Sequence, residues 1–337
     1  MNILESADLT DKHAFGVPWS ADFYIALKDP EQLQEIIEQK GKKKLFVLGG
    51  GSNILPTKKM KGIVLHNQIK GRKIVQENIS HVHIRVGAGE NWHNTVLYCI
   101  RKGYFGFENL TLIPGTVGGG VVQNIGAYDV EISSFVHQVE AHSLQTGEKK
   151  VFAGTDCGFE YRNSIFKHSD EWIVTHVTFK LQKKFKPVLT YKPLQHLKKK
   201  NDLTAKEVSQ TVAKIRKSKL PDWNKVGTAG SFFANPRVEQ KTVKRLLKNY
   251  PDMPVFYNYN STIATVPAGW LIEHSSVRPE DRVEFLYHKH ALVVINNQKG
   301  MSMPPNKGAR IKNFVSRVAK IVERDFGIIL APEVKIL

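Results

Sequence analysis

Two glycine-rich segments are the parts of this sequence best suited to holding a large ligand. The first consists of Gly49, Gly50, Gly51, Ser52 and Asn53, directly after a short apolar run. Consecutive glycines let the backbone approach a ligand closely and direct its N–H groups at it, and a pyrophosphate suits such a nest best. A tight turn between two core strands is the alternative interpretation.

The second segment spans residues 113–128 and reads IPGTVGGGVVQNIGAY. Glycine-rich loops of this length are unusual inside a compact chain and are usually functional or disordered, and this one is too apolar for disorder. Its glycines fit a loop that lies flat against a planar ligand, with Gln123, Asn124 and Tyr128 as polar groups. A purely structural loop is the alternative.

Several nucleotide-binding and catalytic motifs are missing. The chain contains no GxGxxG and no Walker A sequence, so a pyrophosphate would not be held as in the common dinucleotide fold. It contains no GxSxG, which argues against an α/β serine hydrolase. Its two cysteines, Cys99 and Cys157, cannot form a CxxC zinc site, and we expect neither a metal nor a disulfide framework. A reducing cytoplasm fits this usage best.

The elements that would position these segments alternate between strands and helices. Helical periodicity and caps, including a capping box from Thr204 and Glu207, predict helices at 91–102, 204–217 and 311–326. Apolar runs and alternation predict strands at 43–48, 62–67, 81–86, 136–143, 151–153, 172–181, 291–296 and 328–337. Interspersed helices and strands predict an α/β or α+β class.

Composition limits the possible partners. The 337 residues suggest two or three domains, without a signal peptide or an apolar stretch long enough to span a bilayer. The formal charge of +18 favours polyanionic ligands, and a basic nucleotide- or nucleic-acid-binding protein is one hypothesis. Only the charge supports it, because zinc-finger spacing and basic heptads are missing. A sugar nucleotide or NADPH accounts for local positive charge equally well, and the remaining excess is unexplained.

Five motifs occur in a characteristic order: GGGSN, IPGTVGG with QNIGAY, EYRNSIFK, GSFFANP and PEV. The series resembles the UDP-N-acetylenolpyruvoylglucosamine reductase family in its longer subtype, and its two glycine loops are similar to FAD enzymes that include vanillyl-alcohol oxidase. The resemblance implies two FAD-binding α/β subdomains and a C-terminal α+β substrate-binding domain. The expected boundaries are 1–70, 71–218 and 219–326, followed by a terminal strand at 327–337.

The implied activity is NADPH-dependent reduction, through bound FAD, of UDP-N-acetylglucosamine enolpyruvate to UDP-N-acetylmuramate. This step belongs to peptidoglycan precursor synthesis and so serves the cell wall, cell shape and cell division. We expect a cytoplasmic monomer that neither binds nucleic acid nor inserts into a membrane. The alternative within the enzyme class is another FAD oxidoreductase of the same fold.

The family's cofactor contacts carry over to both glycine segments. The matching positions are Gly49, Gly50, Gly51, Ser52, Asn53, Ile113, Pro114, Gly115, Thr116, Gly118, Gln123, Asn124, Gly126, Ala127, Tyr128 and Arg162.

The resemblance also implies three catalytic residues. Adding hydride to an unsaturated carboxylate builds negative charge, which needs hydrogen-bond donors or cations, and the adjacent carbon then needs a proton. Ser231 matches the family's proton donor, whereas Arg162 and Glu333 match residues that stabilise the intermediate. Without the resemblance, a buried turn serine, a surface ion pair and a solvated strand end would be the ordinary interpretations of these three positions.

Four further positions match residues that hold the substrate: Tyr191, Lys219, Asn235 and His290. The Tyr191 match implies the longer subtype, in which a tyrosine loop covers the substrate. His290 could equally be a core histidine. Ala234 stands where relatives usually carry a basic residue, and Asp129 stands where glycine is common. Neither departure removes a residue that the reaction needs.

Overall fold

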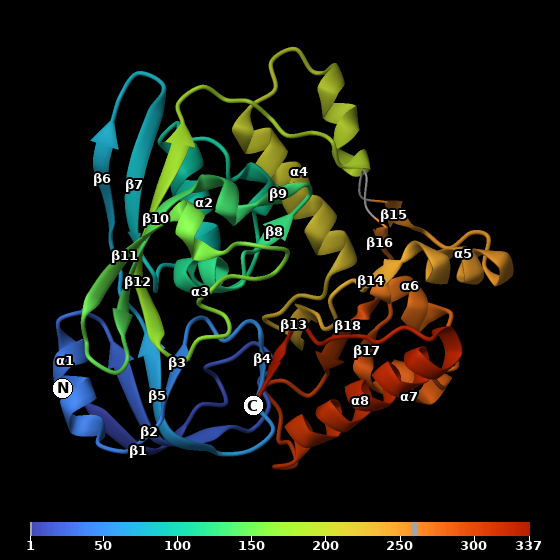
Figure 1. Ribbon diagram of the computed structural model, residues 1–337, viewed down its shortest axis with the longest axis horizontal. Coiled ribbons are helices and arrows are strands. Elements are labelled where there is room, and N and C mark those ends of the chain that lie inside the picture. Colours follow the sequence, from blue (N-terminus) through green and yellow to red (C-terminus); the bar gives the residue numbers. More distant parts are fainter. Residues whose placement is uncertain (1, 258–261) are drawn as a thin grey trace. The chain divides into compact units, whose positions relative to one another are not determined.

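The computed structural model describes residues 2–257 and 262–337, and the chain divides into two compact units. The first unit consists of residues up to Ala7, Ala21–Gly51 and Met60–Ser218. The second consists of Asp8–Ser20, Ser52–Lys59 and Lys219–Leu337. Figure 1 labels the elements, and most of the second unit lies in its orange and red segments.

The first unit begins with a small sheet whose strand order is β1-β2-β5-β3. Its elements are β1 (Ile3–Asp8), β2 (Ser20–Leu27), α1 (Gln32–Lys40), β3 (Leu45–Leu48) and β5 (Met60–Asn67). Both β2 and β3 run parallel to β5, and α1 contributes Leu33 and Ile36 to the core beneath the sheet. The predicted strands at 43–48 and 62–67 are confirmed, and β3 runs directly into the first glycine segment.

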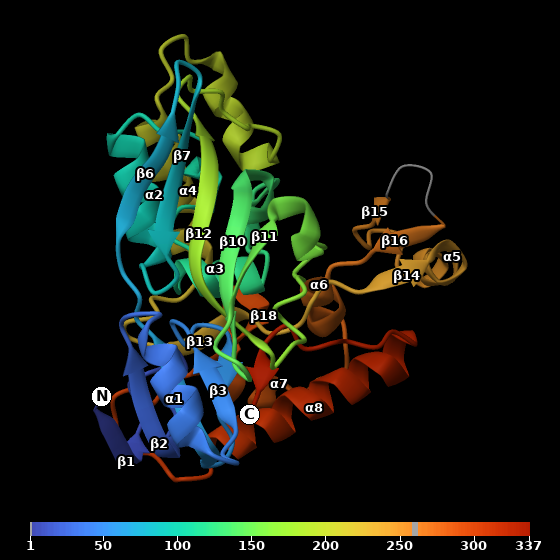
Figure 2. The same ribbon diagram turned by 60° about the vertical axis from the view of Figure 1, so that its left-hand side comes forward.

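A five-stranded antiparallel sheet with the order β11-β10-β12-β7-β6 forms the larger part of this unit. Its strands are β6 (Arg72–Glu77), β7 (His81–Gly87), β10 (Val136–Ser143), β11 (Lys149–Ala153) and β12 (Trp172–Gln182). Alternate residues of β7, namely Val82, Ile84 and Val86, are buried against helices α2 (Trp92–Arg101) and α3 (Val117–Val122). Figure 2 shows both helices behind the sheet.

The second glycine segment contains more regular structure than its sequence indicates. It holds α3 and strand β8 (Gly126–Ala127), which pairs with β9 (Val130–Glu131), and the short helix η1 (Glu108–Leu110) precedes it. The prediction of an irregular loop is therefore wrong for residues 117–122. Glycines form this helix because tertiary packing outweighs their low helix propensity: a Cβ at Gly118 would lie 2.7 Å from the Ala88 Cβ.

Helix α4 (Ala205–Lys219) closes the first unit and begins at the predicted capping box. The Thr204 backbone N–H donates to Glu207 (2.9 Å), and the Glu207 N–H donates to the Thr204 hydroxyl (3.3 Å). Helix α4 shares a small core with the segment before it, which includes η4 (Lys192–Lys199). Two other short helices of this unit are η2 (Ile132–Phe135) and η3 (Gly154–Cys157).

The second unit is built around the long helix α8 (Lys307–Phe326), whose predicted apolar face is buried and which ends at Gly327 with a φ of 68°. One of its sheets contains β13 (Gly227–Ser231), β18 (His290–Asn296) and β17 (Leu286–Tyr287). Another contains β14 (Arg237–Glu239), β16 (Ile263–Thr265) and β15 (Phe256–Tyr257). The other helices are α5 (Gln240–Asn249), α6 (Ala268–Glu273) and α7 (Pro279–Phe285).

The terminal strand is shorter than predicted. Only β19 (Lys335–Ile336) pairs as a strand, parallel to β4 (Ile54–Leu55). Proline has no N–H for a sheet ladder. The chain before β19, which carries Pro332, makes an isolated bridge to Phe233 instead.

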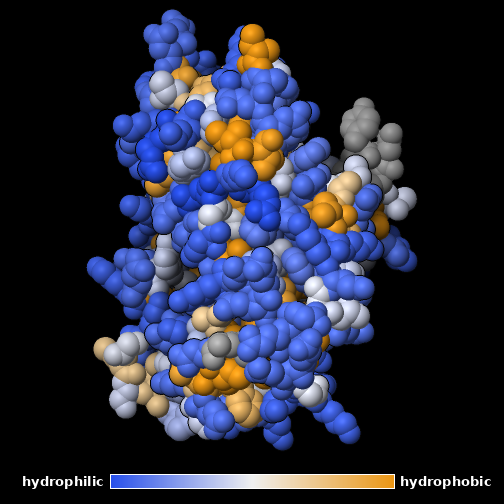
Figure 3. Space-filling model, turned by 90° about the vertical axis from the view of Figure 1, so that its left-hand side faces the viewer, coloured by the Kyte–Doolittle hydropathy of each residue, from blue (hydrophilic) through white to orange (hydrophobic). Residues whose placement is uncertain are grey.

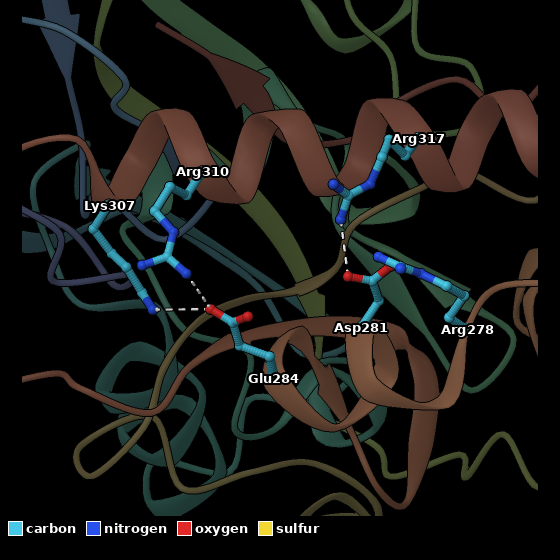
Figure 4. Close-up of polar contacts among 6 residues, drawn as sticks. All are labelled: Arg278, Asp281, Glu284, Lys307, Arg310 and Arg317. Atoms are coloured by element: carbon cyan, nitrogen blue, oxygen red, sulfur yellow. Dashed lines mark hydrogen bonds and ion pairs between the residues drawn. The ribbon is translucent and has the colours of Figure 1, made fainter.

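Ion pairs join α7 to α8 (Figure 4). Glu284 lies 2.9 Å from Arg310 and 3.9 Å from Lys307. Asp281 lies 2.9 Å from Arg317 and 3.1 Å from Arg278. Because most of these side chains are solvated, each pair contributes little. The stacked rings of Phe285 and Phe314, 4.7 Å apart, provide the buried contact between the two helices.

The surface is mainly hydrophilic on the face shown in Figure 3, where the hydrophobic patches are small and separate. Throughout the part of the chain that the structure describes, every helix is too short or too polar to cross a bilayer.

The antiparallel sheet contains a buried carboxylate whose removal we expect to change acid stability. Glu140 receives hydrogen bonds from Arg85 at 2.5 and 2.8 Å and pairs with Lys149 at 2.6 Å. Arg85 first, and then Lys149, lower the pKa of Glu140 from 4.5 to about 2. The resulting stabilisation is present above about pH 4.5 and is lost as the pH falls toward 2.

Glu140→Gln should therefore lower the free energy of unfolding by about 1 kcal/mol at pH 7, a value reduced for solvent screening of the partners. Urea titrations at pH 7 and pH 3 measure the effect. The difference between wild type and variant should shrink at pH 3, and an equal difference at both pH values would contradict this role for Arg85 and Lys149.

Candidate active site

The two predicted glycine segments meet within the first unit. A Cβ at Gly50 would lie 2.7 Å from the Gly115 Cα and 3.2 Å from the Thr116 backbone nitrogen. A Cβ at Gly49 would lie 3.0 Å from the Thr116 hydroxyl oxygen. Contacts below 3.0 Å are too short for a real side chain, so the backbones approach this closely only because residue 50 is glycine. Gly51 has a φ of 61°, which also favours glycine.

Helix α2 and the chain before it anchor the second segment. The Trp92 N–H donates to the Gly115 carbonyl (3.1 Å), and the Gly118 N–H donates to the Ala88 carbonyl (2.8 Å). An isolated bridge joins Asn91 to Thr116. The segment is thus held by its main chain. Its other predicted cofactor residues lie in the same unit: Ile113 and Ala127 border the core, Gln123 is buried, and Pro114 is half-buried.

Asn124 uses its side chain inside the protein. It is fully buried, and its amide nitrogen donates to Glu131 (3.1 Å) and to the Glu160 carbonyl (2.8 Å). Its amide oxygen accepts from the Ser133 N–H (3.2 Å). The φ of 44° at this residue suits asparagine better than most side chains. The observed hydrogen bonds of the Asn124 side chain are to protein groups, and they shape the loop.

Arg162 lies over the end of the second segment. Its guanidinium donates to the carbonyls of Gly126 (2.6 Å) and Asn124 (3.5 Å) and lies 3.9 Å from Glu131. Arg162 itself has a φ of 55°, and a non-glycine residue in this conformation costs free energy that often marks a functional position. This placement agrees with a role at the second glycine segment.

Arg216 is a second cation at this position, and the sequence analysis missed it. It donates to the Leu112 carbonyl (3.2 Å) and hydrogen-bonds the Tyr128 phenol. Burial lowers the pKa of Arg216, whereas Tyr128 raises it, and an arginine remains charged under such shifts. A sequence signal exists, because Arg216 follows Val208 and Val212 at intervals of four on the buried face of α4.

In the second unit, Ser231 ends β13 opposite Val293 of β18. The pairing is irregular between Thr228 and Ser231, and Gly230 has a φ of 76°. Such a bulge redirects the side chains that follow it. Phe232 is fully buried, and its N–H donates to the Leu292 carbonyl (2.9 Å), so the residue after Ser231 is rigidly held while Ser231 itself is half-buried.

Glu333 lies beside this strand. Its N–H donates to the Phe232 carbonyl (2.8 Å), and the Asn53 amide nitrogen donates to the Glu333 carbonyl (3.1 Å). The Lys335 N–H in turn donates to the Asn53 carbonyl (3.0 Å). Ser52 and Asn53 belong to the second unit. The contact observed for the Asn53 side chain therefore positions the segment that carries Glu333.

Three predicted substrate residues also lie in the second unit. Burial lowers the pKa of His290, Glu273 opposes this shift, and Lys219 adds to it, so both charged groups lie near the imidazole. The Leu292 N–H approaches His290 Nδ1 at 3.4 Å. The Asn235 side chain accepts from the Ala268 N–H (3.0 Å) at the start of α6. Tyr191 belongs to the first unit, where its ring contacts Tyr128 at 4.9 Å.

The residues of the first unit fit the predicted FAD. The glycine segments offer main chain unobstructed by side chains at their point of contact, which suits a pyrophosphate or a flat ring. Arg162 and Arg216 supply positive charge at the end of the second segment. In the second unit, Ser231 and Glu333 offer a hydroxyl and a carboxylate on neighbouring chain segments.

Comparison with known families agrees with this division. A family model described as an FAD binding domain matches residues 21–151. A second model, the C-terminal domain of UDP-N-acetylenolpyruvoylglucosamine reductase, matches residues 222–337. The crystal structure of UDP-N-acetylenolpyruvylglucosamine reductase from Thermus caldophilus superposes with a TM-score of 0.65 at 22% identity, covering 99% of this chain and 98% of that one. The predicted fold class is confirmed.

Curated relatives match over the whole chain. A UDP-N-acetylenolpyruvoylglucosamine reductase from Amoebophilus asiaticus is 38% identical and covers all of both chains. The reductase of that name from Flavobacterium johnsoniae is 37% identical, again with full coverage, and one from Porphyromonas gingivalis is 34% identical over 99% of each chain. This protein therefore belongs to the UDP-N-acetylenolpyruvoylglucosamine reductase family.

Proposed function

We propose that this enzyme reduces UDP-N-acetylglucosamine enolpyruvate to UDP-N-acetylmuramate, with NADPH as the source of electrons and FAD as the bound carrier. The observation that carries the proposal is the hydrogen bond from the Glu333 N–H to the Phe232 carbonyl. It holds the chain segment that carries Glu333 beside the segment that carries Ser231. A hydroxyl and a carboxylate in this arrangement suit protonation next to a developing carboxylate charge.

When bound, FAD would supply the hydride that adds to the enolpyruvyl double bond. Ser231 then transfers its hydroxyl proton to the adjacent carbon, and solvent restores the proton to the serine oxygen. The hydride and the proton together account for the two hydrogens that the double bond gains. A serine hydroxyl is a weak acid, but the electron-rich carbon is a strong base, so the transfer is favourable.

The charged residues stabilise the negative charge that develops on the substrate carboxylate. Arg162 provides a rigid guanidinium, which binds carboxylates through two parallel N–H groups. Glu333 contributes through a hydrogen bond to the enolic carboxylate or to an intervening water. Phe232 and Phe233 are buried next to Ser231 and keep the main chain around the serine dry.

Substrate binding is assigned to Lys219, Asn235, His290 and Tyr191. Lys219 binds a phosphate or the reacting carboxylate through its positive charge. Burial lowers the pKa of His290, Glu273 opposes this shift and Lys219 adds to it, which favours the neutral imidazole with its one donor and one acceptor. Tyr191 contributes a phenol and an aromatic face.

We infer that the enzyme acts in peptidoglycan precursor synthesis in the cytoplasm. The supporting observation is the state of Cys99 and Cys157, which are both buried free thiols. Burial raises the pKa of each to about 12, so neither is a reactive thiolate at neutral pH. Through its product the enzyme serves cell-wall formation, cell shape and cell division.

The proposed reaction predicts that purified protein is yellow and oxidises NADPH rapidly only when UDP-N-acetylglucosamine enolpyruvate is present. The assay follows NADPH absorbance with and without that substrate, and NADH serves as the comparison donor. A yellow protein whose NADPH oxidation ignores the substrate would indicate another flavin oxidoreductase. A protein that stays colourless after FAD is added would contradict the flavin function altogether.

The proton-donor role predicts that Ser231→Ala separates the two half-reactions. Flavin reduction by NADPH should stay close to the wild-type rate, because it needs no proton from Ser231. Reoxidation of the reduced flavin by substrate should slow by roughly 10²–10⁴, as for other lost general acids. Stopped-flow flavin absorbance measures both steps, with Ser80→Ala in the β6–β7 hairpin as the control. Equal slowing of both steps would refute the role.

A further inference from the structure

The turn that ends the second glycine segment is strained. Residues Tyr128 and Asp129 form the two-residue turn between β8 and β9 and have φ values of 53° and 64°. A two-residue hairpin turn with both φ values positive favours glycine, above all at its second position. A non-glycine residue there costs free energy, although aspartate tolerates this conformation better than most side chains. Because Asp129 stands in this conformation although glycine would fit better, we expect its side chain to make a specific contact.

That contact is with the segment that carries Tyr191. The Thr190 hydroxyl donates to the Asp129 carboxylate at 2.7 Å, and both side chains are exposed. A second tie lies beneath it, where the buried Asn109 amide donates both to the Tyr128 carbonyl (2.8 Å) and to the Val188 carbonyl (3.0 Å). The turn and residues 188–190 are thus joined on a solvent-facing side and on a buried side.

The hydrogen bonds of Thr190 and Asn109 hold the chain segment that leads into Tyr191. Its ring lies edge-on to Tyr128 at a centroid distance of 4.9 Å, and it borders the small core of Leu189, Leu194, Leu197, Val208 and Val212. That core holds the segment on its other side. On the side that faces the turn, Thr190 donates its hydrogen bond to Asp129, and Thr190 directly precedes Tyr191 in the chain.

We propose that Asp129 is a positioning residue, which acts through Thr190 to hold Tyr191 in place before substrate binds. The inference rests on the proposed function, because it concerns the substrate-binding Tyr191. A side chain that is already placed loses less conformational entropy on binding, so the tie strengthens substrate binding without touching the substrate. Because water competes for both partners, an exposed hydrogen bond makes a modest net contribution and can open and re-form.

Four single variants and one double variant test the hydrogen bond between Asp129 and Thr190. Asp129→Gly removes the acceptor and also relieves the backbone strain, so a lost fold cannot explain its effect. Thr190→Val removes the donor and keeps the shape of the side chain. Asp129→Asn keeps an acceptor oxygen, tolerates positive φ, and should rescue the function. Thr155→Val is the matched control, because the Thr155 hydroxyl makes an exposed contact with its neighbour Asp156 (3.2 Å) in η3, away from the turn.

Asp129→Gly and Thr190→Val should each raise KM for the UDP-linked substrate roughly fivefold and leave kcat within about twofold, the size expected for one hydrogen bond. The double variant should be no worse than either single one, because both changes break the same bond. Asp129→Asn and Thr155→Val should match the wild type. Unchanged KM in Asp129→Gly, or a further loss in the double variant, would overturn the proposal.

Hydrogen exchange of residues 186–192 in the enzyme without substrate provides a readout that does not depend on activity. Exchange should quicken in Asp129→Gly and Thr190→Val, and unchanged exchange would overturn the tie whatever the kinetics show. If the wild type fails to respond to the substrate, the proposed function fails, and the positioning role of Asp129 fails with it. Faster exchange would then still establish that Asp129 holds this segment.

Discussion

The backbone contact between Gly50 and Gly115 is the constraint on which the first unit depends. A Cβ at residue 50 would lie 2.7 Å from the Gly115 Cα, so any side chain there must force the two segments apart. The parallel sheet delivers the first segment at the end of β3, and helix α2 fixes the second through the Gly115 carbonyl. Arg162 and Arg216 then add positive charge at the end of the second segment.

The second unit brings together the chain segments that carry Ser231 and Glu333, which are far apart in sequence. Phe232 anchors one segment in the core, and its carbonyl accepts the Glu333 N–H. Asn53 holds the same C-terminal segment from its other side. Main-chain hydrogen bonds and the Asn53 side chain therefore hold the segments that carry Ser231 and Glu333 next to each other.

Periodicity predicted the elements with strong apolar patterns, such as β7, β12 and α8, because burial of one face determines those patterns. It missed α3, whose glycines form a helix only through contacts with Ala88 and other residues distant in sequence. Motif order predicted roles for the glycine segments and for Ser231. It could not show that Asn124 is saturated by protein partners, or that the Asn53 side chain contacts Glu333, because both depend on long-range packing. Arg216 was detectable as a charge on the buried face of α4, but it lies outside the five motifs.

The most direct test of the account is the flavin content of Gly50→Ala. Separation of the glycine segments should reduce bound FAD well below one per chain and weaken FAD affinity at least about tenfold. Gly103→Ala is the matched control. Gly103 has a φ of 74° but open space around it, so alanine there should lower the free energy of unfolding by about 1 kcal/mol without contacting either glycine segment. Flavin absorbance per protein and FAD titration measure both. A Gly50→Ala protein that binds FAD as the wild type does would contradict the central claim.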